Sequence, residues 1–204
     1  MRMNSIAKIW NERWRIEENN KFNLANMGIF VKDLQILVRK MLSKLRLPEK
    51  SKILDIGGAT GRNLQFYFND CNKNFEFFIV DISDEALRVA ETKGFKTFCL
   101  DIETAQLPFS DNTFDIIIAQ ELIEHLYNPE MLVKEVSRTL KGGGFFLLTT
   151  PNIVSLHDRL RQGVYLPFKF FRSKKYIKFP FIHKITKTLG QHIVIIGRKQ
   201  IEHY

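Results

Sequence analysis

Apolar residues recur along the chain with two different periods, which predict where helices and strands form. From Asp33 to Leu45 they return every three or four positions, the spacing of one helix face. Short apolar runs, typical of strands buried on both faces, lie at Lys52–Ile56, Glu76–Val80, Lys96–Leu100, Phe114–Ala119 and Gly144–Thr149. Helical stretches separate these runs at Asn63–Asn69, Asp84–Lys93 and Pro129–Leu140.

This alternation of strands and helices predicts the α/β class. Strands joined by helices run parallel through right-handed crossovers, so we expect a doubly wound, mostly parallel Rossmann-like sheet. With 204 residues, 45% of them hydrophobic, the chain can form one domain around a single core. Within that domain we expect an N-terminal helical cap at 1–50, a core at 51–152 and a basic aromatic tail or lid at 153–204.

The positive charge lies in the tail. Residues 151–204 hold 11 of the 31 Lys and Arg residues but only two of the 22 Asp and Glu residues, so the net charge of +9 falls there. Between Tyr165 and Tyr176, aromatic side chains alternate with cations, a pattern that suits an anionic membrane surface. We expect contact with such a surface through 164–187. A lid over a binding site is the open alternative, and nucleic acid is less favoured.

Cysteine content and hydropathy indicate the compartment. Two cysteines, Cys71 and Cys99, cannot build a disulfide framework, and no Cys or His spacing matches a zinc site. Residues 1–21 carry charges every few positions and lack the apolar core of a signal peptide. No apolar run approaches the roughly 18 residues that cross a bilayer. We therefore expect a cytoplasmic protein, peripheral to a membrane if its tail meets one.

A loop of small residues follows the first predicted strand. In Ile53-Leu54-Asp55-Ile56-Gly57-Gly58-Ala59-Thr60-Gly61, small side chains let the backbone approach a ligand, and the following helix offers N–H donors. The glycine offsets fit neither the G-x-G-x-x-G dinucleotide motif nor a P-loop, which needs Gly-Lys-Ser/Thr. By itself the loop is equally compatible with a tight turn that binds nothing.

Acidic residues end three successive predicted strands, at Asp55, Asp81 and Asp101. Because the carboxyl ends of parallel strands share one edge of the sheet, these acids should line one crevice. Asp81 can accept both ribose hydroxyls of an adenosine, and Asp101 with the apolar Ile102 can meet the edge and face of an adenine. Helix capping is the alternative explanation, but three acids at consecutive strand ends favour a binding site.

Five ordered motifs resemble the class I S-adenosylmethionine-dependent methyltransferases, in particular the small-molecule branch similar to the ubiquinone/menaquinone-biosynthesis methyltransferases. They lie at Leu54–Gly61, Val80–Ser83, Leu107–Asp115, Glu124–Leu126 and Leu140–Gly144. The resemblance implies that S-adenosylmethionine is the cofactor, that Asp81 holds its ribose, and that Asp101 with Ile102 frames its adenine. It assigns further cofactor contacts to Asp55, Gly57, Gly58, Ala59, Gly61, Ile82 and the backbone of Gln120.

The chain departs from that family pattern in three places. Ala59 replaces the middle glycine of G-x-G-x-G, and Gly142 stands where proline usually precedes the fifth strand. The antiparallel hairpin that ordinarily completes the sheet looks missing or incomplete, because His192–Ile196 and the residues after it resemble the lead-in to an earlier helix. Alternatively, His192–Ile196 itself adds an edge strand. A bare edge at Gly144–Thr149 would invite a homo-oligomer.

Several residues after the fourth predicted strand lie where a methyl acceptor would bind. His125 is the candidate catalytic residue, because a histidine can take a proton from an acceptor, although we favour a role in ordering the loop. Glu121 and Glu124 either face the acceptor or are solvated.

Trp10 and Trp14, four positions apart on one predicted helix, either cover the acceptor pocket or pack against the core.

The sequence therefore predicts an enzyme that transfers the methyl group of S-adenosylmethionine to a small-molecule or lipid-linked acceptor. The alternative is a non-catalytic methyltransferase-like module that its basic tail attaches to a membrane or a partner. The cofactor acids favour the enzyme, whereas a missing hairpin would favour the module.

Overall fold

The computed structural model describes residues 7–12, 15, 29–71, 73–151, 185–189 and 192–199. They form one seven-stranded sheet in the order β3-β2-β1-β4-β5-β7-β6. The first five strands run parallel, and β7 and β6 run antiparallel to their neighbours. Their bounds are β1 Lys52–Ile56, β2 Glu76–Asp81, β3 Lys96–Cys99, β4 Phe114–Gln120, β5 Leu140–Pro151, β6 Ile185–Leu189 and β7 His192–Arg198. The predicted α/β class with a mostly parallel sheet is confirmed.

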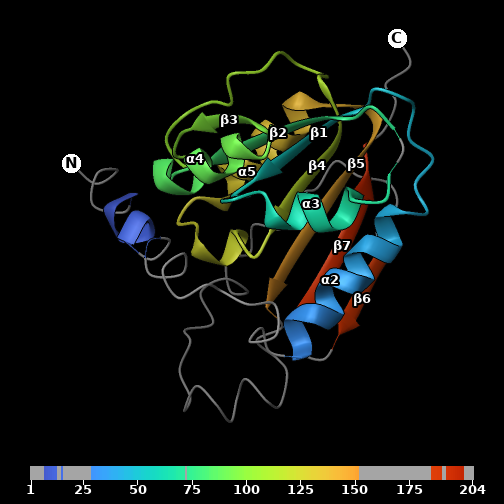
Figure 1. Ribbon diagram of the computed structural model, residues 1–204. Coiled ribbons are helices and arrows are strands. Elements are labelled where there is room, and N and C mark those ends of the chain that lie inside the picture. Colours follow the sequence, from blue (N-terminus) through green and yellow to red (C-terminus); the bar gives the residue numbers. More distant parts are fainter. Residues whose placement is uncertain are drawn as a thin grey trace, which may run out of the picture.

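Helices cover both faces of the sheet. Figure 1 shows α2 (Ile29–Leu42) and α3 (Arg62–Phe68) in front of it. Their apolar residues share one core cluster with α4 (Asp84–Thr92), whereas α5 (Pro129–Thr139) packs with the connection after β3 in a second cluster. Successive residues of a strand point to opposite faces, so Ile116 and Ile118 of β4 enter the first cluster while Ile117 enters the second.

The terminal hairpin is present, so the expectation that it is missing or incomplete was wrong. β7 pairs with β5 from Phe145↔Arg198 to Pro151↔His192, and β6 pairs with β7 (Figure 1). The alternative that His192–Ile196 forms a strand is confirmed, but β7 lies inside the sheet and β6 lies at its edge. The edge of β5 is therefore occupied within the chain, which removes the surface on which we expected a second copy.

The hairpin was missed because β6 does not resemble a core strand. Ile185-Thr-Lys-Thr-Leu189 alternates apolar with polar residues and carries a lysine, as edge strands do, and it lies in a segment that composition marks as a basic tail. The distance between the two strands in the sequence is the feature that indicates a hairpin. Only two residues, one of them Gly190, separate two runs that contain β-branched residues. Part of the expected tail thus belongs to the sheet. Residues 164–184 lie outside the described residues, so contact of 164–187 with a membrane surface stays a prediction.

The long connection between β3 and β4 is fixed by one ion pair on α5. Arg138 donates to the carbonyl oxygens of Leu107 and Phe109 at 2.9 and 2.7 Å and pairs with the buried Glu135 at 2.6 Å. Glu135 in turn accepts the Leu107 N–H at 2.8 Å. Because this connection starts at the carboxyl end of β3, the pair positions one wall of the crevice described below.

We expect removal of the hairpin to expose β5 and cause aggregation. A chain that ends after residue 184 loses both strands, so the backbone groups and apolar side chains of β5 become an unpaired edge. A matched chain that ends after residue 199 keeps both strands. Size-exclusion chromatography should find the shorter chain aggregated and the longer one unchanged, and equal solubility of the two would contradict this role of β7.

Candidate functional site

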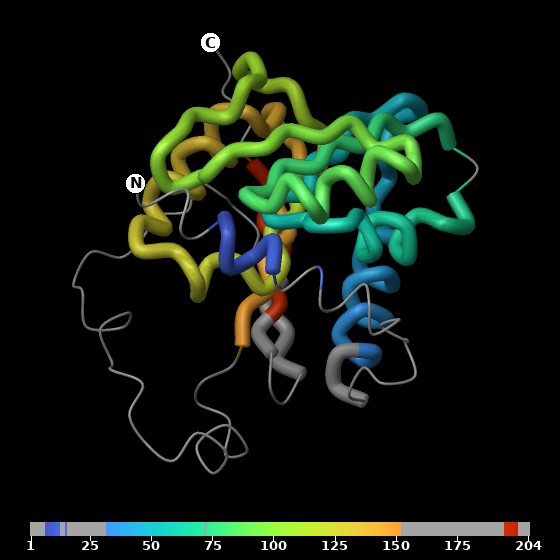
Figure 2. The backbone as a smooth tube through the Cα atoms, turned by 60° about the vertical axis from the view of Figure 1, so that its left-hand side comes forward, coloured from blue at the N-terminus to red at the C-terminus, as the bar shows by residue number. Residues whose placement is uncertain are grey.

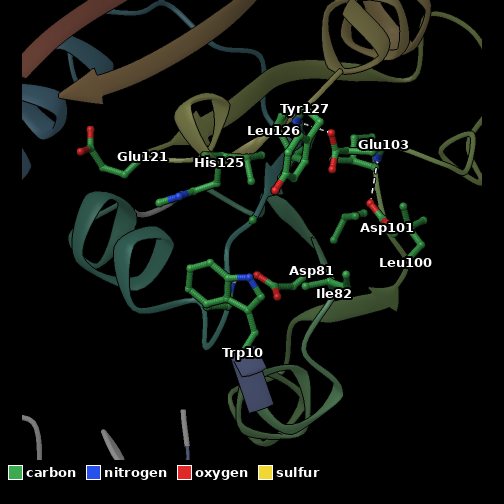
Figure 3. Close-up of a pocket in the computed structure, with 16 residues that line it drawn as sticks. Trp10, Asp81, Ile82, Leu100, Asp101, Glu103, Glu121, His125, Leu126 and Tyr127 are labelled. Atoms are coloured by element: carbon green, nitrogen blue, oxygen red, sulfur yellow. Dashed lines mark hydrogen bonds between the residues drawn. The ribbon is translucent and has the colours of Figure 1, made fainter. Parts of the chain in front are cut away.

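One cavity of about 450 Å³ opens at the carboxyl ends of the parallel strands (Figure 3). This is where ligands bind in open α/β sheets, and the volume falls in the range of small-molecule sites. The chain segments at the ends of four parallel strands line it, together with one residue from the N-terminal part of the chain. They contribute Gly57 and Ala59 after β1, Asp81 and Ile82 at the end of β2, Leu100 to Glu103 after β3, Glu121, Leu122 and His125 to Tyr127 after β4, and Trp10.

The loop after β1 has a backbone that only small residues allow. Gly57 and Gly61 have φ of 75° and 70°, and Ala59, where the family pattern has glycine, has φ of 47°. A Cβ on Gly61 would come within 2.4 Å of Phe95, so the start of α3 is packed too closely for any side chain. The Gly57 N–H donates to the carbonyl oxygen of Val80 at 2.7 Å, which joins the loop to β2.

Asp81 holds this loop from the neighbouring strand. One carboxylate oxygen accepts the Ala59 N–H at 2.9 Å, and the other accepts the Ser83 N–H at 2.9 Å. Burial raises the pKa of Asp81, and the backbone hydrogen bonds oppose that rise. A carboxylate has about four lone-pair positions, so Asp81 retains acceptor capacity toward the cavity that it lines.

Asp55, Gly58 and Gly61 are expected cofactor residues that do not line the cavity. Asp55 is only 2% exposed, and a Cβ on Gly58 would come within 2.7 Å of its carboxyl carbon. Burial, with a further contribution from Asp81, raises the pKa of Asp55 to about 8. A glycine at position 58 therefore leaves room for the Asp55 carboxyl group, which packs against the loop.

Asp101 and Ile102 line the cavity, as expected, at the end away from Glu121 and His125 (Figure 3). Asp101 accepts the Glu103 N–H at 2.9 Å, which fixes the turn that carries it. Leu100, Ile82 and Ile102 add apolar surface beside this carboxylate. An adenine ring, with an apolar face and a polar edge, matches this combination.

Gln120 ends β4 but does not line the cavity. Its side-chain oxygen accepts hydrogen bonds from the Tyr67 hydroxyl and from the Asn63 amide, at 3.3 Å for the latter. The side chain thus joins β4 to α3. The expected contribution of its backbone to cofactor binding stays a prediction.

Glu103 is a cavity residue that sequence reasoning missed. Its carboxylate accepts the backbone N–H groups of Tyr127 and Asn128, the second at 2.7 Å (Figure 3 draws the contact with Tyr127). This contact joins the wall after β3 to the wall after β4. In the sequence, Glu103 reads as an ordinary solvated acid in a turn, and no local pattern indicates the distant backbone groups that it binds.

Trp10 reaches the cavity from a short helical segment, residues 7–12, which Figure 2 shows in dark blue beside the yellow segment after β4. Its ring meets the ring of His125 edge-on, with centroids 5.6 Å apart. Asn11 fixes the segment, because it accepts from the Ser83 hydroxyl at 2.7 Å and donates to Asp84 at 2.6 Å. Trp10 thus lies over the pocket, whereas Trp14 lies outside the described residues.

Glu121 and His125 lie at one end of the cavity, away from Asp101 and Leu100 (Figure 3). Thr149 of β5 donates its hydroxyl to the Glu121 carboxylate at 2.8 Å, and the Glu121 N–H approaches the same hydroxyl oxygen at 3.2 Å. Burial, assisted by the nearby Glu124, raises the pKa of Glu121 to about 7. His125 keeps 51% of its side chain exposed.

Parts of the chain are similar to proteins described as methyltransferases. Residues 54–148 match the family described as "Methyltransferase domain". The uncharacterized protein MJ1123 of Methanocaldococcus jannaschii is 27% identical over 175 residues, which cover 85% of this chain and 77% of that protein. Rv3030 of Mycobacterium tuberculosis, named a probable S-adenosylmethionine-dependent methyltransferase, is 28% identical over 76 residues, covering 37% of this chain and 28% of that protein.

Two further similarities concern shorter or more distant matches. The ubiquinone/menaquinone biosynthesis C-methyltransferase UbiE of Paraburkholderia xenovorans is 29% identical over 101 residues, which cover 48% of this chain and 42% of UbiE. The crystal structure of the CurJ carbon methyltransferase superposes with a TM-score of 0.68 at 19% identity, covering 87% of this chain and 57% of that chain. That structure shares the fold.

None of the helices within the described residues has the length and apolar character to cross a membrane.

We expect Asp81→Ala to weaken the binding of S-adenosylhomocysteine. The variant would lose the charge-assisted hydrogen bonds that we expect Asp81 to accept from the ribose, and it loses those that shape the loop. The expected cost is about 1.5 to 3 kcal/mol, or roughly ten- to a hundredfold in affinity. Calorimetric titration measures this directly. Asp70→Ala, which removes an exposed carboxylate far from the cavity, is the control, and unchanged binding by the Asp81 variant would refute the assignment.

A second prediction concerns the pH dependence of stability. The folded state raises the pKa of Asp55 from 3.8 to about 8, so it retains a proton that the unfolded chain releases. The contribution of Asp55 to the free energy of unfolding should therefore fall as pH rises across that interval. Urea denaturation of Asp55→Asn should show a weaker decline with pH than the wild type. Asp70→Asn should keep the wild-type slope, and equal slopes for all three proteins would show that Asp55 does not titrate in this way.

Proposed function

We propose that this chain is a class I S-adenosylmethionine-dependent methyltransferase and that it transfers the methyl group of its cofactor to a small-molecule or lipid-linked acceptor. The observation that carries the proposal is that the cavity at the strand ends has two chemically different ends (Figure 3). One end combines carboxylates with apolar surface and suits an adenosine. The other presents Glu121, His125 and Trp10 to whatever binds beside the reactive group.

The described residues fit S-adenosylmethionine part by part. We assign the ribose hydroxyls to Asp81 and the adenine to Asp101 with Leu100 and Ile102. We assign the amino-acid portion to the loop from Gly57 to Gly61, of which Gly57 and Ala59 line the cavity. Asp55 acts on the cofactor through that loop, because its carboxyl group lies against Gly58.

The cofactor supplies a methyl group on a sulfonium, which is already reactive toward a lone pair. The protein's task is then alignment, since a substitution in line with the departing sulfur depends on proximity and orientation. The hydrogen bonds of Asp81 and Glu103 fix two walls of the cavity, and Trp10 lines it beside His125. Holding both reactants in one partly covered cavity supplies that alignment.

The acceptor class is supported by the similarity to UbiE, whose name gives ubiquinone and menaquinone biosynthesis. The interface-type composition of 164–187 supports a lipid-linked acceptor in the same way. The non-catalytic module has lost its main support, because the hairpin whose absence would have favoured it is present.

Incubation with methyl-labelled S-adenosylmethionine tests the proposal. Water-soluble and lipid extracts are offered separately to the purified chain, and label should pass to a product in one of them. Binding of S-adenosylhomocysteine without any labelled product would support the non-catalytic module instead.

His125→Ala should lower turnover by less than about tenfold on whichever extract accepts the label. The histidine is half-exposed and contacts Trp10 edge-on, which indicates a role in ordering the wall. A general base typically contributes about 10²- to 10⁴-fold. A loss on the order of a hundredfold, together with a pH–rate profile that loses one limb, would instead show that His125 is the base.

A further inference from the structure

One polar side chain of α2 is buried in the core. Gln35 is only 3% exposed, whereas the other buried side chains in the described part of this helix are apolar: Leu34, Val38, Met41 and Leu42. Burial of an amide is unfavourable unless its polar atoms are hydrogen-bonded. The groups that Gln35 contacts are therefore the guide to its role.

Gln35 begins a chain of side-chain hydrogen bonds that runs from α2 through α3 to the sheet (Figure 1). Its Nε2 donates to Oδ1 of Asn63 at 2.8 Å, and Nδ2 of Asn63 donates to Oε1 of Gln120, at the end of β4, at 3.3 Å. The Tyr67 hydroxyl donates to the same Oε1, and burial raises the pKa of Tyr67, so this donor keeps its proton. Both lone pairs of that oxygen are thus used, which holds the Gln120 amide in one orientation.

This chain of hydrogen bonds ends next to one wall of the cavity. Asn63 lies two positions after Gly61, where the loop after β1 ends, and Gln120 lies two positions before Leu122. Gly57 and Leu122 both line the cavity, and a Cβ on Gly57 would come within 3.1 Å of the Leu122 side chain. The contact between Asn63 and Gln120 therefore joins the two segments that meet at this wall.

The wall formed by Gly57 and Leu122 lies on the side of the cavity that the proposed function assigns to the amino-acid portion of the cofactor. The adenosine is assigned to Asp81 and Asp101, which lie at the end of β2 and after β3 and take no part in the chain of hydrogen bonds. A change in this chain should therefore affect the amino-acid portion more than the adenosine.

We infer that Gln35 is a positioning residue for the cofactor, which acts through Asn63 and Gln120 on the wall that receives the amino-acid portion. This inference rests on the function proposed above. Gln35 does not itself line the cavity. Its N–H group instead decides which way the Asn63 amide faces. An amide whose oxygen accepts from Gln35 leaves its nitrogen to donate to Gln120.

A purely structural role for the same hydrogen bonds predicts a different result. If they only satisfy buried amide groups, their loss lowers the free energy of unfolding and leaves the preference between ligands unchanged. If they position the wall, their loss weakens a ligand that contacts the wall and spares one that does not. The ratio of two ligand affinities therefore separates the two roles.

The test compares two ligands that share an adenosine. S-Adenosylhomocysteine carries the amino-acid portion and methylthioadenosine lacks it, and both are titrated calorimetrically into the wild type, Gln35→Met and Ile36→Met. Methionine keeps the length of the Gln35 side chain but donates no hydrogen bond. Ile36→Met places the same residue at the neighbouring position, which is 57% exposed, and should change neither affinity.

Gln35→Met should weaken S-adenosylhomocysteine binding about threefold to tenfold, the range expected for one lost hydrogen bond, and methylthioadenosine binding less than about twofold. Losses from residues that act through one another do not add. The double variant Gln35→Met/Asn63→Ala should therefore bind S-adenosylhomocysteine no more weakly than Asn63→Ala alone.

Each outcome decides the inference. Equal weakening of both ligands by Gln35→Met overturns it, as do an unchanged affinity for S-adenosylhomocysteine and losses that multiply in the double variant. If Gln35→Met does not fold, Asn63→Ala breaks the same chain at a less buried residue and takes its place in the comparison. Failure of the wild type to bind either ligand contradicts the proposed function itself. Binding of both with an unchanged ratio in the variants contradicts only the role of Gln35.

Discussion

The site depends on the half-buried carboxylate of Asp81, which holds the loop after β1 from the neighbouring strand. By accepting the N–H of Ala59, it fixes a residue whose left-handed backbone costs about 1 to 2 kcal/mol when a side chain is present. By accepting the N–H of Ser83 with its other oxygen, it also sets the start of α4. The group that suits the ribose is therefore the group that shapes the loop beside it.

The remaining walls are joined by polar contacts between segments far apart in sequence. Glu103 links the connection after β3 to the loop after β4, and Arg138 with Glu135 anchors the same connection to α5. Asn11 places Trp10 over the opening by pairing with the cap of α4. The sheet supplies the positions of the strand ends, and these contacts join the segments after them into the walls of one partly covered cavity.

Local pattern was sufficient to predict the parallel core, because buried strands and amphipathic helices carry their periods in sequence. It also located Asp81 and Asp101, since strand ends of a parallel sheet meet at one edge. It could not assign Asp55 to a supporting position, because burial behind Gly58 depends on the path of the loop. Glu103 was missed for a similar reason, since its partners lie 24 and 25 residues away. The hairpin was missed because an edge strand that alternates polar with apolar residues looks like a tail.

The central claim is that the cavity at the strand ends binds S-adenosylmethionine. Calorimetric titration of the unaltered chain with S-adenosylmethionine and with S-adenosylhomocysteine tests it most directly. The account predicts saturable binding of both ligands at one site per chain. It further predicts that adenosine competes with them, because the carboxylates and apolar surface are assigned to that moiety. Absence of measurable binding by either ligand would contradict the account.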